Sequence, residues 1–187
     1  AAKDNSLYEE ALLLIGESHY ALKDLVQSEK YYNQYLSEFP KGRYANDIMI
    51  KQSKVVAVNK DPKEALKFLI DKYYDLEKSS EPAQREEITL NICLTYFEIG
   101  GFSEYLQWSE IYLNNYKNSS YAKIIKYNQI ISFYKLNRTD EAIKSATGFL
   151  TENPDFDKND QLYFLIGTIK YNNKEYVDAL FNFKKLF

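Results

Sequence analysis

Residues that carry chemistry or break helices are scarce in this chain. Its 187 residues include one cysteine, one histidine, six glycines and four prolines. The single cysteine, Cys93, excludes an internal disulfide and a cysteine-based metal site. No run of about 18 apolar residues occurs, so no membrane-spanning helix is predicted. The shortage of turn-forming residues favours long helices packed side by side.

Charge of one sign is not in excess either. Lysine and arginine number 24 against 27 aspartates and glutamates, which gives a net charge of −3, and the two signs are interspersed. A surface that binds nucleic acid normally carries a basic stripe, so no nucleic-acid partner is expected.

Groups that could catalyse a reaction or hold a metal ion do not converge in the sequence. His19 is the only histidine, and neither a phosphate-binding loop nor a zinc-ligand set is present. Asp155, Asp157 and Asp160 lack the glycine and the distal glutamate of an EF-hand calcium loop, so we interpret them as solvated residues at a helix start. We therefore expect no enzymatic activity, no cofactor and no metal site.

Aromatic side chains are abundant, with 18 tyrosines and 11 phenylalanines, and many of them fall in a repeating pattern. The small residue of the pattern, first seen at Gly16, recurs at intervals of 37, 40, 37 and 37 residues, at Ser53, Cys93, Ile130 and Gly167. Such a period is typical of helix pairs that stack and bury their apolar faces against one another. The first repeat shows the pattern most completely, at Leu12, Ile15, Gly16, His19, Ser28, Tyr32, Tyr35 and Pro40.

These residues resemble the tetratricopeptide repeat over nearly the whole chain. The resemblance implies an all-α fold, a right-handed superhelix or α-solenoid of about five helix pairs that form a single domain over residues 1–187. Gly16 and Gly167 are predicted at close contacts between paired helices. The apolar pattern at the C-terminal end lacks a helix cap, so we expect a fragment of a longer chain. The predicted repeats span about residues 6–40, 43–78, 82–117, 119–154 and 157–187.

Several other residues have predicted structural roles in these pairs. Ala65, Ala142 and Ala179 are expected to face the small positions from the partner helix. In the third repeat Tyr105 stands where alanine is usual and Ser109 where phenylalanine is usual, a swap that can conserve volume. Packing roles are also predicted for His19, for Cys93 as an inert buried thiol and for Trp108.

A second resemblance lies in the joints between repeats. Residues 39–45 and 116–122 are similar to the aromatic-Pro-x-Ser-x-Tyr-Ala joint of bacterial envelope tetratricopeptide proteins, although Gly42 replaces the serine in the first joint and the second lacks the proline. That group includes the lipoprotein of the outer-membrane β-barrel assembly machine and the periplasmic coordinator of the Tol-Pal system. The resemblance implies a periplasmic, outer-membrane-associated protein with a lipid anchor outside this fragment. The cytoplasm is the alternative.

A binding groove is predicted on the concave side, which the first helix of each pair lines in this family. Its inward positions lie three residues before and four residues after the small site. Nine of the ten residues at these positions are large and apolar or aromatic, so we expect an exposed, contiguous apolar strip, which is typical of a partner site. The lysine and asparagine clamp of the chaperone adaptors is missing, so we expect a protein or peptide partner bound by apolar contacts. The predicted groove residues are Leu13, Tyr20, Ile50, Leu90, Phe97, Tyr127, Tyr134, Phe164 and Tyr171.

The sequence leaves alternatives open. Any single groove residue could instead pack one first helix against the next. The principal hypothesis is a non-enzymatic scaffold for bacterial envelope assembly or maintenance. A second is a structural spacer or oligomerisation module whose apolar C-terminal helix docks on another copy or a following domain through Phe181, Phe183 and Phe187. A third, a cytosolic peptide-sensing regulator, would require a DNA-binding domain, and none is visible in the sequence.

Overall fold

A computed structural model describes residues 5–59, 61–77 and 82–187, and in these residues the secondary structure is helical, without a β-strand. This confirms the predicted all-α fold of stacked helix pairs. The chain divides into two compact units, Ala1–Thr95 and Tyr96–Phe187, and the boundary falls within the fifth helix. Each unit is described here by itself.

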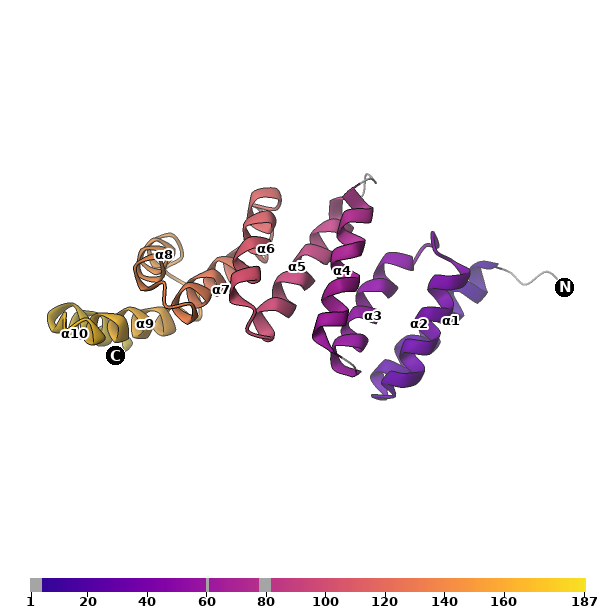
Figure 1. Cartoon of the computed structure of the whole chain (residues 1–187), viewed down its shortest axis with the longest axis horizontal. Helices are drawn as coiled ribbons and strands as arrows, with labels where there is room; N and C mark the ends of the chain where they lie inside the picture. Colours follow the sequence, from indigo (N-terminus) through magenta and orange to yellow (C-terminus); the bar gives the residue numbers. More distant parts are fainter. Residues whose placement is uncertain (1–4, 60, 78–81) are drawn as a thin grey trace. The chain divides into compact units, whose positions relative to one another are not determined.

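In the first unit, consecutive helices run antiparallel and pack on one another, α1 on α2, α2 on α3 and α3 on α4 (Figure 1). As predicted, α4 begins at Pro62. The carboxylate of Asp61 caps this helix by accepting a hydrogen bond of 2.9 Å from the Lys63 backbone N–H. The predicted end of the second repeat, near Lys78, lies outside the described residues. The helices are α1 (Asn5–Ala21), α2 (Leu25–Glu38), α3 (Ala45–Asn59), α4 (Pro62–Glu77) and α5 (Pro82–Glu98), whose last turn belongs to the second unit.

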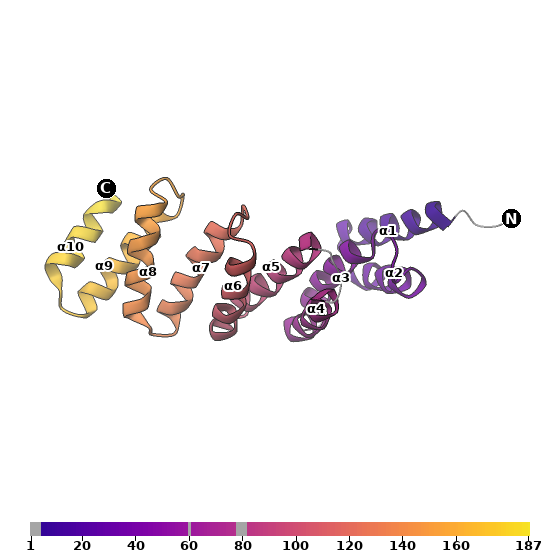
Figure 2. The same ribbon diagram turned by 90° about the horizontal axis from the view of Figure 1, so that it is seen from above.

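The second unit continues the same arrangement, with α7 against both α6 and α8 and α9 against both α8 and α10 (Figure 2). The last helix is short and passes into a 3₁₀ turn, η1, that folds back on α9. The helices are α6 (Phe102–Asn115), α7 (Ala122–Lys135), α8 (Thr139–Glu152), α9 (Asn159–Asn172), α10 (Tyr176–Phe183) and η1 (Lys184–Leu186).

In four of the helix pairs, the turn between the two helices contains one residue with a left-handed backbone. Lys23, Gly100, Asn137 and Lys174 have φ values of 59°, 76°, 59° and 65°. A left-handed residue just past the last helical turn is a common way to end a helix, although glycine usually occupies it. These four residues are spaced as the small positions of their repeats are, which supports the predicted period. The corresponding residue of the second repeat, at position 60, lies outside the described residues.

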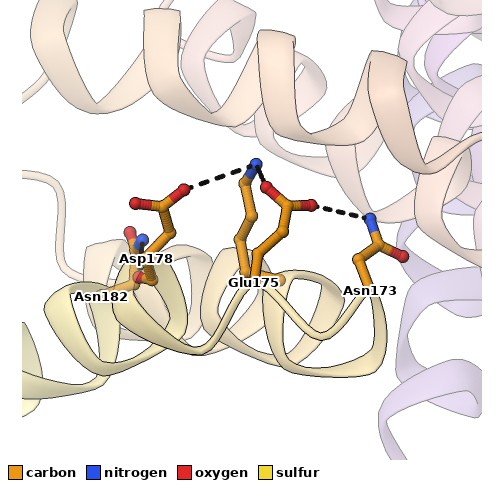
Figure 3. A network of polar contacts seen from close by, with 5 residues as sticks. Asn173, Glu175, Asp178 and Asn182 are labelled. Carbon is orange, nitrogen blue, oxygen red and sulfur yellow. Dashed lines mark hydrogen bonds and ion pairs between the residues drawn. The ribbon is translucent and has the colours of Figure 1, made fainter.

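Polar side chains hold the last of these turns in place (Figure 3). The Lys170 Nζ atom lies 2.5 Å from Glu175 Oε2 and 4.0 Å from Asp178 Oδ2. Asn173 Nδ2 donates a hydrogen bond of 3.2 Å to Glu175 Oε1. The end of α9 and the start of α10 are therefore tied together on both sides of Lys174.

The predicted close contacts between paired helices are confirmed. A Cβ atom built on Gly16 would lie 2.5 Å from Cε1 of Tyr32, and one on Gly167 would lie 2.6 Å from Cε1 of Phe183. Both distances are far shorter than van der Waals contact, so an aromatic ring of the second helix occupies the space beside each glycine. The alanines on the facing helices, Ala65, Ala142 and Ala179, are buried as predicted.

In the third repeat both residues of the predicted swap lie in α6, are buried and form hydrogen bonds with α7. Tyr105 is fully buried and donates a hydrogen bond of 2.8 Å to the backbone carbonyl of Ile125. The small Ser109 is also buried and accepts a hydrogen bond of 2.8 Å from Gln129 Nε2. Trp108 is buried beside them, which confirms its predicted place in the core.

The joints show why Gly42 and Ser119 differ. Ser119 Oγ lies 2.6 Å from the hydroxyl of Tyr112. In the first joint the equivalent tyrosine, Tyr35, instead donates to the carboxylate of Glu9. A Cβ atom on Gly42 would lie 2.6 Å from the Tyr35 hydroxyl and would also overlap this carboxylate. Glycine at position 42 therefore leaves room for the hydrogen bond from Tyr35 to Glu9 of α1. In the second joint the equivalent tyrosine, Tyr112, instead bonds to Ser119 of the joint itself.

Replacing Gly167 with alanine tests the helix contact, and Gly148 in the same unit provides a matched control. We expect Gly167→Ala to lower the free energy of unfolding by about 1–3 kcal/mol, because the new methyl group overlaps the ring of Phe183. Gly148→Ala meets no atom within 4 Å and should raise it by about 0.5–1 kcal/mol, as expected for an exposed helix interior. Urea unfolding followed by circular dichroism measures both. Equal effects of the two substitutions would contradict the contact.

Candidate functional site

The nine predicted groove residues differ in exposure. The earlier groove position, three residues before the small site, is buried in four repeats. Its exposed fractions are 9%, 2%, 8% and 5% at Leu13, Ile50, Leu90 and Tyr127. The expectation of a continuous exposed strip is therefore wrong at these positions. Their part in binding stays a prediction, but their side chains are largely covered in this structure. The fifth residue of the series, Phe164, is 57% exposed.

Tyr127 shows how the earlier position becomes covered. Its hydroxyl donates a hydrogen bond of 2.6 Å to Gln161 Oε1 of the next pair, and its ring lies 5.6 Å from that of Phe156. Lys158 Nζ lies 5.5 Å from the ring centroid. Burial raises the pKa of the Tyr127 hydroxyl, and the charges of nearby aspartates raise it further. The residue thus links α7 to the following pair.

At the later groove position, four residues after the small site, the side chains remain more accessible. Phe97 and Tyr134 are half-buried, whereas Tyr20 and Tyr171 are 43% and 58% exposed. Tyr134 packs against the core cluster of the second unit, and two of the other rings lie near aromatic neighbours. Phe97 lies 5.3 Å from Tyr105, between ring centroids, and Tyr171 lies 5.5 Å from Tyr176.

An apolar hollow of about 510 Å³ in the second unit brings two predicted residues together. It is formed by α7, α9 and η1, and Tyr134 and Phe164 both line it. The other predicted residues of this unit, Phe97, Tyr127 and Tyr171, do not line the hollow, and Leu13, Tyr20, Ile50 and Leu90 belong to the first unit. The complete lining is Ile131, Tyr134, Lys135, Asp160, Gln161, Phe164, Leu165, Thr168 and Leu186.

Sequence reasoning missed part of this lining. Ile131 and Thr168 directly follow the small positions Ile130 and Gly167, so they occupy equivalent places on α7 and α9. That equivalence is a signal that the sequence contains. Leu186 could not be found in this way, because it reaches the hollow only after α10 ends and the chain turns into η1.

A second hollow, of about 540 Å³, adjoins the first at Tyr134 and Lys135. Its lining is mostly polar and includes Asn137, Asn172 and Asn173 from the turns of the fourth and fifth pairs. Tyr134 therefore stands where an apolar surface meets a polar one. A ring with a hydroxyl group at its tip suits such a boundary.

The charged ends of the apolar hollow differ in sign. Asp160 lies in the first turn of α9, and Lys135 is the last residue of α7. Because α8 runs antiparallel to both α7 and α9, those two helices run in the same direction. A carboxylate thus lies at the starting end of the hollow and an ammonium group at the other.

His19 holds two helices of the first pair together. Its ring stacks on that of Tyr31, with centroids 5.5 Å apart and an interplanar angle of 10°. Its Nδ1 atom lies 3.2 Å from a carboxylate oxygen of Asp24, the residue that caps α2. These contacts confirm the predicted packing role at a helix boundary.

Cys93 is a buried thiol, as predicted. It is fully buried, and burial raises the pKa of the thiol to about 12. The described part of the chain contains no group of three histidine, cysteine, aspartate or glutamate side chains placed to hold a metal ion. No helix among the described residues is long and apolar enough to cross a membrane.

Comparison with known proteins gives a family match for one repeat and a fold match for the chain. Residues 10–42 match the family model of the tetratricopeptide repeat. No curated protein matches the chain. Several solved structures are similar to this chain in fold but share little sequence identity with it.

Three solved structures illustrate the fold match. A structure titled MamA MSR-1 C2 is 14% identical over 96% of this chain and 95% of that one, with a TM-score of 0.67. Another MamA protein is 17% identical over 95% and 89% of the two chains, with a TM-score of 0.71. A putative kinesin light chain of Podosopora anserina, with nearly identical TPR-like repeats, is 8% identical over 95% and 92%, with a TM-score of 0.72. These likenesses show the TPR-like fold.

The reactivity of Cys93 tests its environment. With a pKa near 12, the thiolate fraction at pH 8 is roughly a thousandfold below that of an ordinary cysteine, whose pKa is about 8.5. Alkylation by iodoacetamide at pH 8 should therefore be at least that much slower in the folded chain than in the same chain in 8 M urea. Because the folded pKa is raised, the stabilisation from this buried thiol is complete below about pH 8 and declines as the pH rises toward 12. Rapid alkylation of the folded chain would contradict the burial.

Proposed function

We propose that the chain is a non-enzymatic scaffold that holds an apolar segment of a partner protein in the hollow between α7 and α9. The single observation that carries the proposal is the convergence of Tyr134 and Phe164 on one open apolar hollow. Its volume of about 510 Å³ falls within the usual range of about 300–1,000 Å³ for ligand sites. The TPR-like fold supports the same proposal, because proteins of this fold typically bind protein partners without catalysing a reaction.

The lining indicates what kind of segment would fit. Ile131, Leu165 and Leu186 offer apolar surface, and Phe164 offers a large exposed ring. Each large apolar side chain that a partner buries there would contribute about 1.5–3 kcal/mol. A partner helix with one apolar stripe satisfies this lining, because its backbone polar groups are already paired within the helix. We propose an amphipathic helix as the bound form.

The charges at the two ends of the hollow give the helix a direction. The carboxylate of Asp160 favours a basic side chain at one end, and the ammonium group of Lys135 favours an acidic side chain at the other. The polar hollow beyond Tyr134 would accept polar side chains that continue the segment. Apolar contacts would therefore supply affinity, while the charges would select the orientation.

We further propose that this scaffold acts in the bacterial periplasm, at the outer membrane, in envelope assembly or maintenance. Support comes from the resemblance of residues 39–45 and 116–122 to the joints of envelope proteins. A lipid anchor outside this chain would be compatible with that location, and the cytoplasm is the alternative. Fractionation of cells that produce the protein from its own gene distinguishes the two. Recovery with the cytosolic fraction would exclude the envelope.

Binding of designed peptides tests the groove. The probes are two fluorescein-labelled 18-residue amphipathic helices with a leucine stripe, one with lysine at its start and glutamate at its end and one reversed, together with a scrambled peptide. We expect one orientation to bind with a Kd of about 10–100 µM. The double substitution Tyr134→Ala, Phe164→Ala should weaken binding at least about tenfold, because the two rings together lose apolar contact worth about 1.4 kcal/mol or more. Fluorescence anisotropy measures the change.

A matched control also removes two aromatic side chains, in this case two tyrosines outside the hollow. Tyr121 and Tyr176 are 51% and 57% exposed and lie outside the hollow. The double substitution Tyr121→Ala, Tyr176→Ala should leave the Kd within about twofold of the original. Equal losses in the two double variants, equal binding of the scrambled peptide, or no binding at millimolar peptide would each reject the groove.

A further inference from the structure

Another hollow of the second unit, of about 460 Å³, is formed by α6, α7 and α8. We call it the α8 hollow. Ile130, Phe133 and Phe149 give it an apolar part. It shares no lining residue with the apolar hollow that Tyr134 and Phe164 line, so it is a separate surface of the chain.

Two small residues of α8, Ser145 and Gly148, lie about one turn apart in the lining of the α8 hollow. No contact within the chain requires glycine at position 148, because a Cβ atom built there meets no atom within 4 Å. Glycine inside a helix is destabilising relative to alanine, but it allows another molecule to approach the backbone closely. The absence of a side chain at this position therefore has a use only toward the hollow.

The five helix pairs can be compared position by position along their second helices. The second helix of each pair begins nine residues after the small position of its repeat, as from Gly16 to Leu25 and from Ile130 to Thr139. Fifteen residues after the small position, the first three pairs carry a large aromatic side chain and the fourth carries a small one. The residues there are Tyr31, Phe68, Trp108, Ser145 and Asn182.

The three aromatic side chains at this position pack against other parts of the chain. Tyr31 is half-buried and stacks on the ring of His19, with the centroids 5.5 Å apart. Phe68 packs against the core cluster of the first unit, and Trp108 is only 8% exposed. A ring at this position is therefore a regular part of a helix pair in this array.

The fourth pair has the surroundings of such a ring but not the ring itself. The residue equivalent to His19 is Phe133, which is half-buried and lines the α8 hollow. The guanidinium carbon of Arg138 lies 4.7 Å from the centroid of this ring. Ser145, at the position from which Tyr31 stacks in the first pair, has no ring to offer. By this equivalence, the α8 hollow lies where the earlier pairs place an aromatic side chain of their own.

The charged groups around the α8 hollow add a preference of sign. Lys126 Nζ lies 3.3 Å from a carboxylate oxygen of Glu152, and Arg138 donates a hydrogen bond of 2.6 Å to Glu141. Lys144 also lines the hollow, and it has no ion-pair partner among the described residues. The ammonium group of Lys144 favours a carboxylate on whatever molecule enters beside it.

We infer that the α8 hollow binds an aromatic side chain of a partner protein that carries an acidic residue next to it. The ring stacks on Phe133 and lies over Gly148, in the place that Tyr31 has in the first pair, and the acidic residue pairs with Lys144. Aromatic side chains suit such a site because they bury a large, rigid area. Since the two hollows share no lining residue, the scaffold can hold this segment and the amphipathic helix at the same time.

Two substitutions that copy the chain's own residues test this site. Ser145→Tyr introduces the residue of the first pair, Tyr31, and Gly148→Gln introduces the equivalent residue of α2, Gln34. The probe is the peptide acetyl-Gly-Asp-Trp-Asp-Gly-amide, titrated into the ¹⁵N-labelled chain while NMR spectra record the amide signals of α8. We expect a Kd of roughly 1 mM for the original chain. Each substitution should weaken binding at least about tenfold, because its side chain fills part of the hollow.

A matched control adds the same ring to α8 outside the hollow. Thr147 is exposed and does not line the hollow, so Thr147→Tyr should leave the Kd within about twofold of the original. Circular dichroism shows whether each variant is folded. Position 148 is exposed, so Gly148→Gln should keep the helix and the test remains decisive if Ser145→Tyr does not fold.

Variants of the peptide test the chemistry of the ligand. Leucine in place of tryptophan should raise the Kd at least about fivefold, because an aliphatic side chain cannot stack on Phe133. Asparagine in place of both aspartates should raise it about threefold at low salt, through the loss of attraction to Lys144. No shift of the α8 signals at about 10 mM tryptophan peptide would overturn the inference. So would equal binding of the leucine peptide, or undiminished binding by the folded substituted chains.

Discussion

The close approach of two helices at a residue without a side chain is the constraint on which the rest of this structure depends. Gly16 and Gly167 leave space that Tyr32 and Phe183 fill, so each ring fixes the distance between the helices of its pair. In the third repeat the residues of the predicted swap, Tyr105 and Ser109, are buried in α6 and form hydrogen bonds with α7.

The exposure of each groove residue is a consequence of this stacking. A first helix shows one edge to the next pair and another to solvent, so its residues divide into those that become covered and those that stay accessible. Tyr127 and Phe164 occupy the same repeat position, but Tyr127 is buried and bonded to Gln161 of the following pair, whereas Phe164 is 57% exposed. The same side chain position is therefore core in one repeat and surface in another. Function in such an array is set by the neighbours of a residue as much as by its identity.

The sequence predicted the parts of the structure that depend on short-range spacing. The period, the paired glycines and alanines and the buried state of Cys93 all follow from positions that recur within a repeat. It did not predict which groove positions are covered, because that depends on the next pair and on the path of the chain between pairs. Leu13, Ile50 and Leu90 could not be told from Tyr20 by hydrophobicity alone. Leu186 joined the hollow through the early end of α10, which no repeat pattern encodes.

The left-handed residues Lys23, Asn137 and Lys174 bear on how the chain folds. Each closes a turn between helices that are adjacent in sequence, and a lysine or asparagine there leaves the unfolded turn fewer conformations than glycine would. The hydrogen bonds between pairs, such as that of Tyr127 with Gln161, span about one repeat. Contacts of such short sequence separation close small loops and favour rapid folding. Folding can accordingly begin at any pair and spread to its neighbours.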